Sequence, residues 1–509
     1  MRRVLILLLW CGDVCLYMAR TNVSVAISQM FGKTTQEGEL LSAFYWGYFL
    51  FQLPAGWLAP RVGAHRLLSA AVTVWSIASA ASCFTGGSIT ALFALRVVVG
   101  CAESCCYPCM SQLLSVWVPY DERGTAWGVV QTGESAGTIL MLLGGPFLIA
   151  SPAGWRSVFW LSAGLGLGWV LVFVFFASAD PAQHRCISDE ERSYIQASRP
   201  PRPPYTKTPW RAILTNRPFL CTIACHVMYN WTFYIGLPPH ARPSKHPAQL
   251  LDLRLPVRAA ASSFSPPSPD APPLLAVSSG LSWIDKFLES SWRATASAGT
   301  LAAASVVPYC CLFVLSALSG VVADNLESRF GFSPTHARKL VNSVGLLGGA
   351  AGFVALSLVA PTGGGGPRGS LMAATACLSV AIGMAGFGAA AGYWATFGDL
   401  SPRHGALLLA LSNALASVPG IVGNTAVGNL LASTHNDWAL VFQICAGTLV
   451  LGALVFLGAE ARDQHLDERR GAGLAAKLLV ADAAAAGEGE GLGAAGSVQA
   501  ADASSSAGA

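Results

Sequence analysis

Residues 1–27 read MRRVLILLLWCGDVCLYMARTNVSVAI, an apolar run that begins after Arg3 and continues past Arg20 to Ile27. Its first ten residues look like a secretory signal peptide. However, no small-residue cleavage site follows cleanly, and the apolar character does not stop where a leader would end. A membrane span needs roughly 20 mostly apolar residues. This stretch therefore predicts a first transmembrane helix rather than a cleaved leader.

Comparable apolar runs recur along all 509 residues of the chain. The mean hydropathy is +0.51, and charged residues make up 11% of the sequence. Soluble domains carry about 25% charged residues, because their surfaces face water. The composition therefore predicts an all-α membrane protein whose helices lie in the lipid bilayer. The net charge of +4 is spread over loops and leaves no basic patch for a nucleic acid.

The apolar runs predict twelve membrane spans, six on each side of a polar stretch. The predicted spans are 4–28, 40–59, 67–86, 89–118, 124–150, 155–179, 218–236, 298–323, 339–361, 370–398, 405–432 and 437–459. Six plus six helices fit two similar bundles around a site near the bilayer midplane, as in the major facilitator fold.

This layout predicts four segments. Residues 1–179 form the N-terminal six-helix bundle, 180–217 a cytoplasmic linker, and 218–459 the C-terminal six-helix bundle. Residues 460–509 form a tail that is rich in alanine and glycine beyond about Gly471. A tail of this composition buries too little surface to offset its ordering entropy, so we expect it to be disordered.

The lysines and arginines predict which side of the membrane the loops face. With an internal N-terminus, 20 of the 31 basic residues fall in internal loops and tails. Three fall in the short external loops, when the long segment after the seventh span is set aside. This asymmetry predicts that both termini are internal.

Residues 236–280 interrupt the pattern, because they contain ten prolines and no apolar span. We interpret the segment as an insertion, arising from a retained intron or a gene-model error. A genuine external loop is the alternative, since long insertions in exposed loops have a small entropic cost.

Arg20, Arg96 and Glu103 lie inside apolar spans, where an ionised group costs about 2.5–3.5 kcal/mol on insertion scales. Such residues therefore face a cavity or a partner. Arg96 and Glu103 are two helical turns apart on one face, about 10 Å along the axis, which is too far for direct contact. We expect a solute, water or another helix between them. The functional interpretation is an anion-attracting arginine beside a protonatable carboxylate, and the alternative is a structural salt bridge between helices.

Asp13 and Arg20 repeat the seven-residue spacing on the first helix. Local pairing of Asp13, or a position near the membrane face, is an equal alternative to a functional role. Glu134 lies between Gly133 and Gly137, and glycines four residues apart predict close helix packing. Glu134 is a further candidate for the lining of a cavity.

His226 and Asn230 share one face of the seventh span, because they are four residues apart. A hydrogen-bonded packing role for His226 is favoured over a proton relay. Asp399 lies where a span meets a loop, which favours a loop-gating or capping role over substrate contact.

Cys101, Cys105 and Cys109 form one stripe on the fourth span. A metal or redox site is conceivable, but small residues that let helices approach closely are the favoured interpretation. No catalytic triad, phosphate-binding glycine loop or metal-spaced cluster stands out in the sequence. We therefore expect a protein that is not an enzyme, with no cofactor and no metal.

Ten segments resemble the sodium/phosphate and vesicular anion transporter family of the major facilitator superfamily, over about residues 14–458 apart from one gap. The family includes sialin, the vesicular glutamate transporters and the plant anion transporters. The matching segments are 17–27 (YMARTNVSVAI), 44–48 (FYWGY), 52–56 (QLPAG), 96–108 with Arg96, Glu103 and Tyr107-Pro108, 154–159 (GWRSVF), 209–213 (PWRAI), 230–234 (NWTFY), 305–309 (SVVPY), 399–403 (DLSPR) and 412–423 with Ser412-Asn413 and PGIVG.

The resemblance implies roles for individual residues. Arg20 and Arg96 are implied as anion-binding arginines, and Glu103 as the residue that couples transport to a cation. Asn22 and Asn230 lie in matching motifs and are implied in substrate binding, with Asn413 as a further candidate.

Three positions depart from particular family members. The vesicular glutamate transporters carry an arginine where this chain has Tyr229 and a histidine where it has Leu41. Sialin carries a histidine where this chain has Ser111. Specificity for glutamate or sialic acid is therefore not implied, and the fourth-span pattern looks nearer to the plant anion transporters.

The sequence thus predicts a secondary active transporter of small anions, with inorganic phosphate favoured, coupled to Na⁺ or H⁺ by alternating access. A vesicular or lysosomal carrier of an organic anion (glutamate, sialate, ascorbate or a nucleotide) is one alternative. A non-transporting sensor or scaffold is another. The plasma membrane, a plastid membrane and a vesicular or lysosomal membrane all stay open.

Overall fold

The structure is a computed structural model that describes residues 1–31, 37–119, 122–197, 208–236, 283–292, 294–362, 365–401 and 404–462. Every regular element in these ranges is a helix, as the composition predicted. The helices discussed below belong to the larger of two compact units, whereas α9 (Trp210–Leu214) belongs to the smaller one.

The long helices follow the predicted spans within a few residues. They are α1 (Arg2–Phe31), α2 (Glu37–Val62), α3 (Ala64–Ser82), α4 (Ile89–Glu103), α5 (Cys106–Trp117), α6 (Arg123–Ile149), α7 (Arg156–Phe176), α10 (Arg217–Gly236), α12 (Ala298–Ser328), α13 (Pro334–Val359), α14 (Leu371–Ala391), α15 (Tyr393–Leu400), α16 (Gly405–Ser433) and α17 (Trp438–Phe456). Because α4 with α5 and α14 with α15 each fill one predicted span, these helices correspond to the twelve predicted spans.

Nine of these spans, within the described residues, are long and apolar enough to cross a membrane by length and composition alone. The three predicted spans outside that set are α2, α3 and α10. Alanine and serine dominate α3, which lowers its hydropathy relative to its leucine-rich neighbours.

Short helices lie between and beside the spans. They are η2 (Pro181–Gln183), α8 (Asp189–Ala197), α9 and α11 (Trp283–Trp292). Residues 237–282 and 463–509 lie outside the described residues. The proposed insertion at 236–280 and the disordered tail therefore stay predictions.

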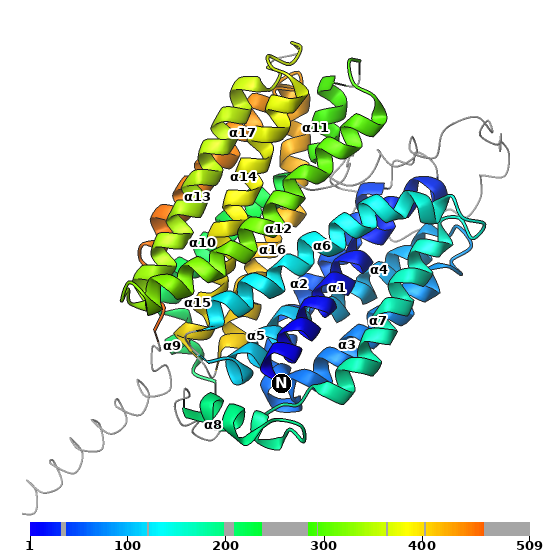
Figure 1. Cartoon of the computed structure of the whole chain (residues 1–509). Helices are drawn as coiled ribbons and strands as arrows, with labels where there is room; N and C mark the ends of the chain where they lie inside the picture. The colour runs from blue at the N-terminus through cyan, green and yellow to red at the C-terminus, as the bar shows by residue number, and fades with distance from the viewer. Residues whose placement is uncertain are drawn as a thin grey trace, which may run out of the picture. The chain divides into compact units, whose positions relative to one another are not determined.

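Helix contacts define two bundles and the interface between them. In the first bundle α1 packs on α6 and α7, α2 on α4, and α3 on α4 and α7, drawn in blue to cyan in Figure 1. In the second bundle α14 packs on α12 and α13, and α17 on α10 and α13. Contacts of α6 with α12, and of α16 with α2 and α5, join the two bundles.

Glycines permit the closest helix approaches in both bundles. A Cβ on Gly100 of α4 would overlap the carbonyl oxygen of Phe44 in α2, and one on Gly345 of α13 would overlap the backbone of Gly388 in α14. Small residues at such crossings let backbones pack against each other inside a membrane. The predicted packing at Gly133 and Gly137 is confirmed, because both lie against the backbone of α1.

Two spans are interrupted at equivalent places, the fourth in each bundle. The first break follows Glu103, where α4 ends and α5 begins three residues later. The second is at Gly392, between α14 and α15. Glu103 is the last residue before the first break, and Trp394 follows shortly after the second.

A buried charge network joins the bundles at the beginning of α6. Asp399 accepts from Arg338 at 3.3 Å and lies 3.6 Å from Arg123 of the first bundle. Asp324 of α12 accepts from the backbone N–H of Thr125 at 2.7 Å. Asp399 is buried in the last turn of α15, and its carboxylate takes part in these ion pairs. The loop-gating or capping role that the sequence favoured stays a prediction.

Candidate substrate site between the two bundles

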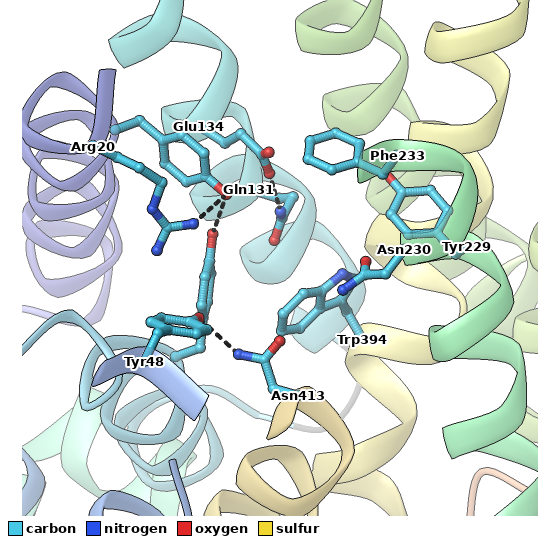
Figure 2. Close-up of a pocket in the computed structure, with 11 residues that line it drawn as sticks. Arg20, Tyr48, Gln131, Glu134, Tyr229, Asn230, Phe233, Trp394 and Asn413 are labelled. Carbon is cyan, nitrogen blue, oxygen red and sulfur yellow. Dashed lines mark hydrogen bonds between the residues drawn. The ribbon is translucent and has the colours of Figure 1, made fainter. Parts of the chain in front are cut away.

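A small cavity lies between the bundles, with a volume of about 30 Å³, which is room for a few water molecules. Its lining comes from α1, α2, α5 and α6 on one side and from α10, α15 and α16 on the other (Figure 2). The lining residues are Tyr17, Arg20, Tyr48, Tyr107, Gln131, Glu134, Tyr229, Asn230, Phe233, Trp394 and Asn413.

Arg20 is the positive charge of this lining. Its Nε donates to Oε2 of Glu103 at 3.1 Å, and its Nη1 lies 3.5 Å from the hydroxyl of Tyr17. Its Nη2 has no hydrogen-bond partner among the described residues. Rings of Tyr17, Phe44 and Tyr48 lie about 5 Å from the guanidinium carbon and partly replace water around the charge. One terminal nitrogen of the guanidinium, Nη2, is thus left without a partner among the described residues.

Glu103 is fully buried and does not line the cavity. As expected from the two-turn spacing, Glu103 makes no direct ion pair with Arg96. Its basic partner comes from another helix. That partner is Arg20 of α1, so the arginine and the carboxylate come from two different spans. The interhelical salt bridge that the sequence left as an alternative therefore exists, with Arg20 as the basic partner.

Arg96 lies behind the cavity rather than in its lining. Its Nη1 and Nη2 donate to the backbone carbonyls of Ala19 and Arg20, each at 3.4 Å. The guanidinium also faces the ring of Phe44 at 5.4 Å. Arg96 thus holds α1 at the residue that presents its charge to the cavity.

The other candidate residues divide between the cavity and its surroundings. Asn230 and Asn413 line the cavity, and Asn413 donates to the hydroxyl of Tyr48 at 2.8 Å across the bundles. Asn22 is buried outside the lining, and its amide atoms have no partner among the described residues. His226 is hydrogen-bonded to Ser412 at 2.9 Å and lies beside Trp394, which fits the packing role that the sequence favoured.

Glu134 lines the cavity, whereas Asp13 lies just behind it. The Gln131 amide donates to Glu134 at 2.7 Å. Asp13 is fully buried and makes no ion pair with Arg20. The two carboxylates come from neighbouring helices, α1 and α6.

Sequence reasoning missed most of the aromatic lining. Gln131 could have been found from its position three residues before Glu134, which places both on one helix face. Trp394 follows Gly392, a glycine that could have marked a broken span. Tyr229 was noted because it replaces a family arginine, but not as a lining residue. No sequence signal distinguishes Phe233 from a core aromatic.

Long apolar helices in two bundles, with a polar cavity and buried charges between them, define a membrane transporter. The sequence model described as Major Facilitator Superfamily matches residues 9–396. The chain belongs to this superfamily of multi-pass membrane transporters, and it is not an enzyme.

Its relatives include transporters of several anions. The chain is 28% identical to the chloroplastic sodium-dependent phosphate transport protein 1 of Arabidopsis thaliana, over 89% of this chain and 78% of that protein. It is 27% identical to the chloroplastic ascorbate transporter of the same plant, over 89% and 74% of the two chains. It is also 27% identical to human sialin, over 82% and 74%. The predicted family resemblance is confirmed.

Solved structures confirm the predicted fold class. The proton:xylose symporter XylE, bound to 6-bromo-6-deoxy-D-glucose, aligns with a TM-score of 0.60 at 13% identity, over 91% of this chain and 98% of that chain. The E. coli fucose:proton symporter FucP aligns with a TM-score of 0.54 at 14% identity, over 89% and 98%. At such low identity the likeness concerns the fold alone.

Proposed function

We propose that this chain is a secondary active transporter of small anions, with inorganic phosphate as the first candidate substrate. The observation that carries the proposal is Arg20, a guanidinium in the lining of an interbundle cavity whose Nη2 has no partner among the described residues. A guanidinium is always charged and can offer two parallel donors to an oxyanion. An arginine is costly inside a membrane, which supports a functional reason for its position.

Coupling follows from the pairing of Arg20 with Glu103 at 3.1 Å. The carboxylate and an incoming anion compete for the same guanidinium. A proton or a sodium ion that neutralises Glu103 removes the competitor, so the cation and the anion bind together. Rocking of the two bundles about the cavity then exposes the loaded site to the other side of the membrane.

The size of the cavity and the relatives support phosphate. A cavity of about 30 Å³ admits even a small anion only after its lining side chains move, and larger solutes require larger movements. A similar plant protein is a sodium-dependent phosphate transport protein.

The test compares Glu103→Gln with the wild-type chain in reconstituted vesicles. Glutamine mimics the neutral carboxyl group, so counterflow exchange of radiolabelled phosphate should persist while accumulation driven by a proton or sodium gradient is lost. Glu190→Gln, on the exposed face of α8, is the matched control and should behave as wild type. Full gradient-driven accumulation by Glu103→Gln would refute the coupling role.

An organic anion is the second candidate, because the wall opposite Arg20 is aromatic. Tyr229, Phe233 and Trp394 form this wall from α10 and α15 (Figure 2), and they could contact a carbon skeleton. Ascorbate and sialate should compete with phosphate uptake if this candidate is right. A purified chain that exchanges none of these anions would contradict both candidates and favour the sensor or scaffold alternative.

A further inference from the structure

Asp13 of α1 and Glu134 of α6 are two buried carboxyl groups on neighbouring helices of the first bundle. The side chain of Asp13 packs directly on Gly133, where an added Cβ would lie 2.8 Å from the Asp13 Cβ and 3.0 Å from its Oδ2. Glu134 is the next residue along α6. Glycine at position 133 is therefore what lets the Asp13 carboxyl group approach α6 beside Glu134.

Asp13 is fully buried, and the Tyr107 hydroxyl and the backbone N–H of Glu134 lie close enough to interact with its carboxyl group. Glu134 is also buried, and its Oε2 accepts a hydrogen bond from the Gln131 side-chain amide at 2.7 Å. The ionisable groups that face the two carboxyl groups are Tyr17 and Arg20 on α1, Cys106 and Tyr107 on α5, Tyr229 on α10 and Tyr393 on α15. Of these, Arg20 alone is positive, and it is already paired with Glu103.

Charge balance makes two ionised carboxylates here costly. Around the two carboxyl groups, Arg20 and Arg96 supply two positive charges, while Asp13, Glu103 and Glu134 supply three negative charges when all are ionised. This group of five side chains would then be net negative before an anion arrived. Like charges in a buried pair favour a state in which the two groups share one proton.

We propose that Asp13 and Glu134 form a proton-binding carboxyl pair, distinct from the Arg20–Glu103 ion pair. The proton comes from the aqueous side to which the cavity opens, binds to a carboxylate oxygen of the pair, and leaves that oxygen as a proton on the same or the opposite side. No bond between heavy atoms forms or breaks.

A proton fits the surroundings better than a metal cation. A metal ion needs several ligands, and no group of three His, Cys, Asp or Glu side chains gathers among the described residues. The Gln131 amide also presents an N–H to Glu134, which suits an anionic or shared-proton oxygen and competes with a cation. A proton needs a single lone pair.

The binding test uses purified full-length chain without any anion, so it is independent of the proposed substrate. Infrared difference spectra between acidic and alkaline buffer should contain a band of a protonated carboxyl group that shifts in D₂O. Asp13→Asn and Glu134→Gln should each remove that band. Glu103→Gln should keep it, and so should the exposed control Glu190→Gln.

Two results of the infrared experiment would overturn the proposed carboxyl pair. A band that persists in both Asp13→Asn and Glu134→Gln overturns the pair, as does a band that responds to sodium ions rather than to pH. If Asp13→Asn does not yield folded protein, Glu134→Gln alone suffices, since a shared proton needs both partners.

A second readout depends on the proposed function. In vesicles, gradient-driven phosphate accumulation by Glu134→Gln should fall to the level reached by counterflow exchange. If the band is lost but no variant, including wild type, transports phosphate, the pair stands and the proposed function fails.

Discussion

Arg20 and Arg96 carry the same guanidinium group in different surroundings. Arg20 lines the cavity and its Nη2 has no partner among the described residues, whereas both terminal nitrogens of Arg96 donate to carbonyls of α1. A lysine keeps the charge but lacks the planar fork. The same substitution should therefore have different effects at the two positions.

Arg20→Lys should weaken phosphate binding about tenfold or more, since a bidentate contact becomes a single one and 1.4 kcal/mol corresponds to a factor of ten. Arg96→Lys should instead lower the free energy of unfolding by about 1.5–3 kcal/mol, because a buried charged hydrogen bond to the α1 backbone is lost. Exchange assays over a range of phosphate concentrations, together with thermal unfolding in detergent, check the two effects. Equal losses of affinity in both variants would show that Arg96 binds the anion directly.

The sequence identified the buried charges but not their partners. Insertion cost singles out Arg20, Arg96 and Glu103 whatever the fold, so these residues could be found without a structure. Spacing along one helix shows which side chains share a face, and it carries no information about a neighbouring helix. The pairing of Glu103 with Arg20 needed the packing of α1 against the first break.

The helices themselves were predictable because apolar length fixes a span. The breaks at Glu103 and Gly392 were not predicted, since apolar character continues through both. The helices that pack against the glycines at close helix crossings were also not predictable. A glycine in a span indicates a close helix contact, but it does not identify the neighbouring helix.

Gly345→Ala tests one of these crossings. Its Cβ would overlap the backbone of Gly388, which cannot turn aside as a flexible side chain would. We expect a loss of about 1–3 kcal/mol in stability from overpacking. Gly447→Ala in α17 is the matched control, because no atom lies within 4 Å of its added Cβ. That change should be neutral or stabilising by up to about 1 kcal/mol, since alanine is the better helix former. Thermal unfolding of both variants in detergent is the measurement, and an unchanged midpoint for Gly345→Ala would mean that α13 and α14 lie farther apart.

The two bundles meet through polar contacts as well as through the cavity. Asp399 lies 3.6 Å from Arg123 across the interface, and Asp324 accepts from the first turn of α6. The sequence placed Asp399 correctly at the end of a span. Its role depended on Arg338, which is 61 residues earlier, and on a helix of the other bundle.

The interior charges also determine how the carrier responds to voltage. With one proton on the Asp13–Glu134 pair and Glu103 ionised, two negative charges balance Arg20 and Arg96, so these five side chains carry no net charge when the carrier is empty. Adding a singly charged anion together with one coupled proton leaves that sum at zero.

Moving one elementary charge through 100 mV changes the energy by about 2.3 kcal/mol, so a carrier that moves none should be indifferent to the membrane potential. Uptake of a monovalent anion into vesicles should therefore be unchanged by a potassium diffusion potential at fixed pH. A doubly charged anion should instead make the loaded step electrogenic, driven by a positive interior. A rate that responds to voltage equally for both anions would contradict this assignment of charges.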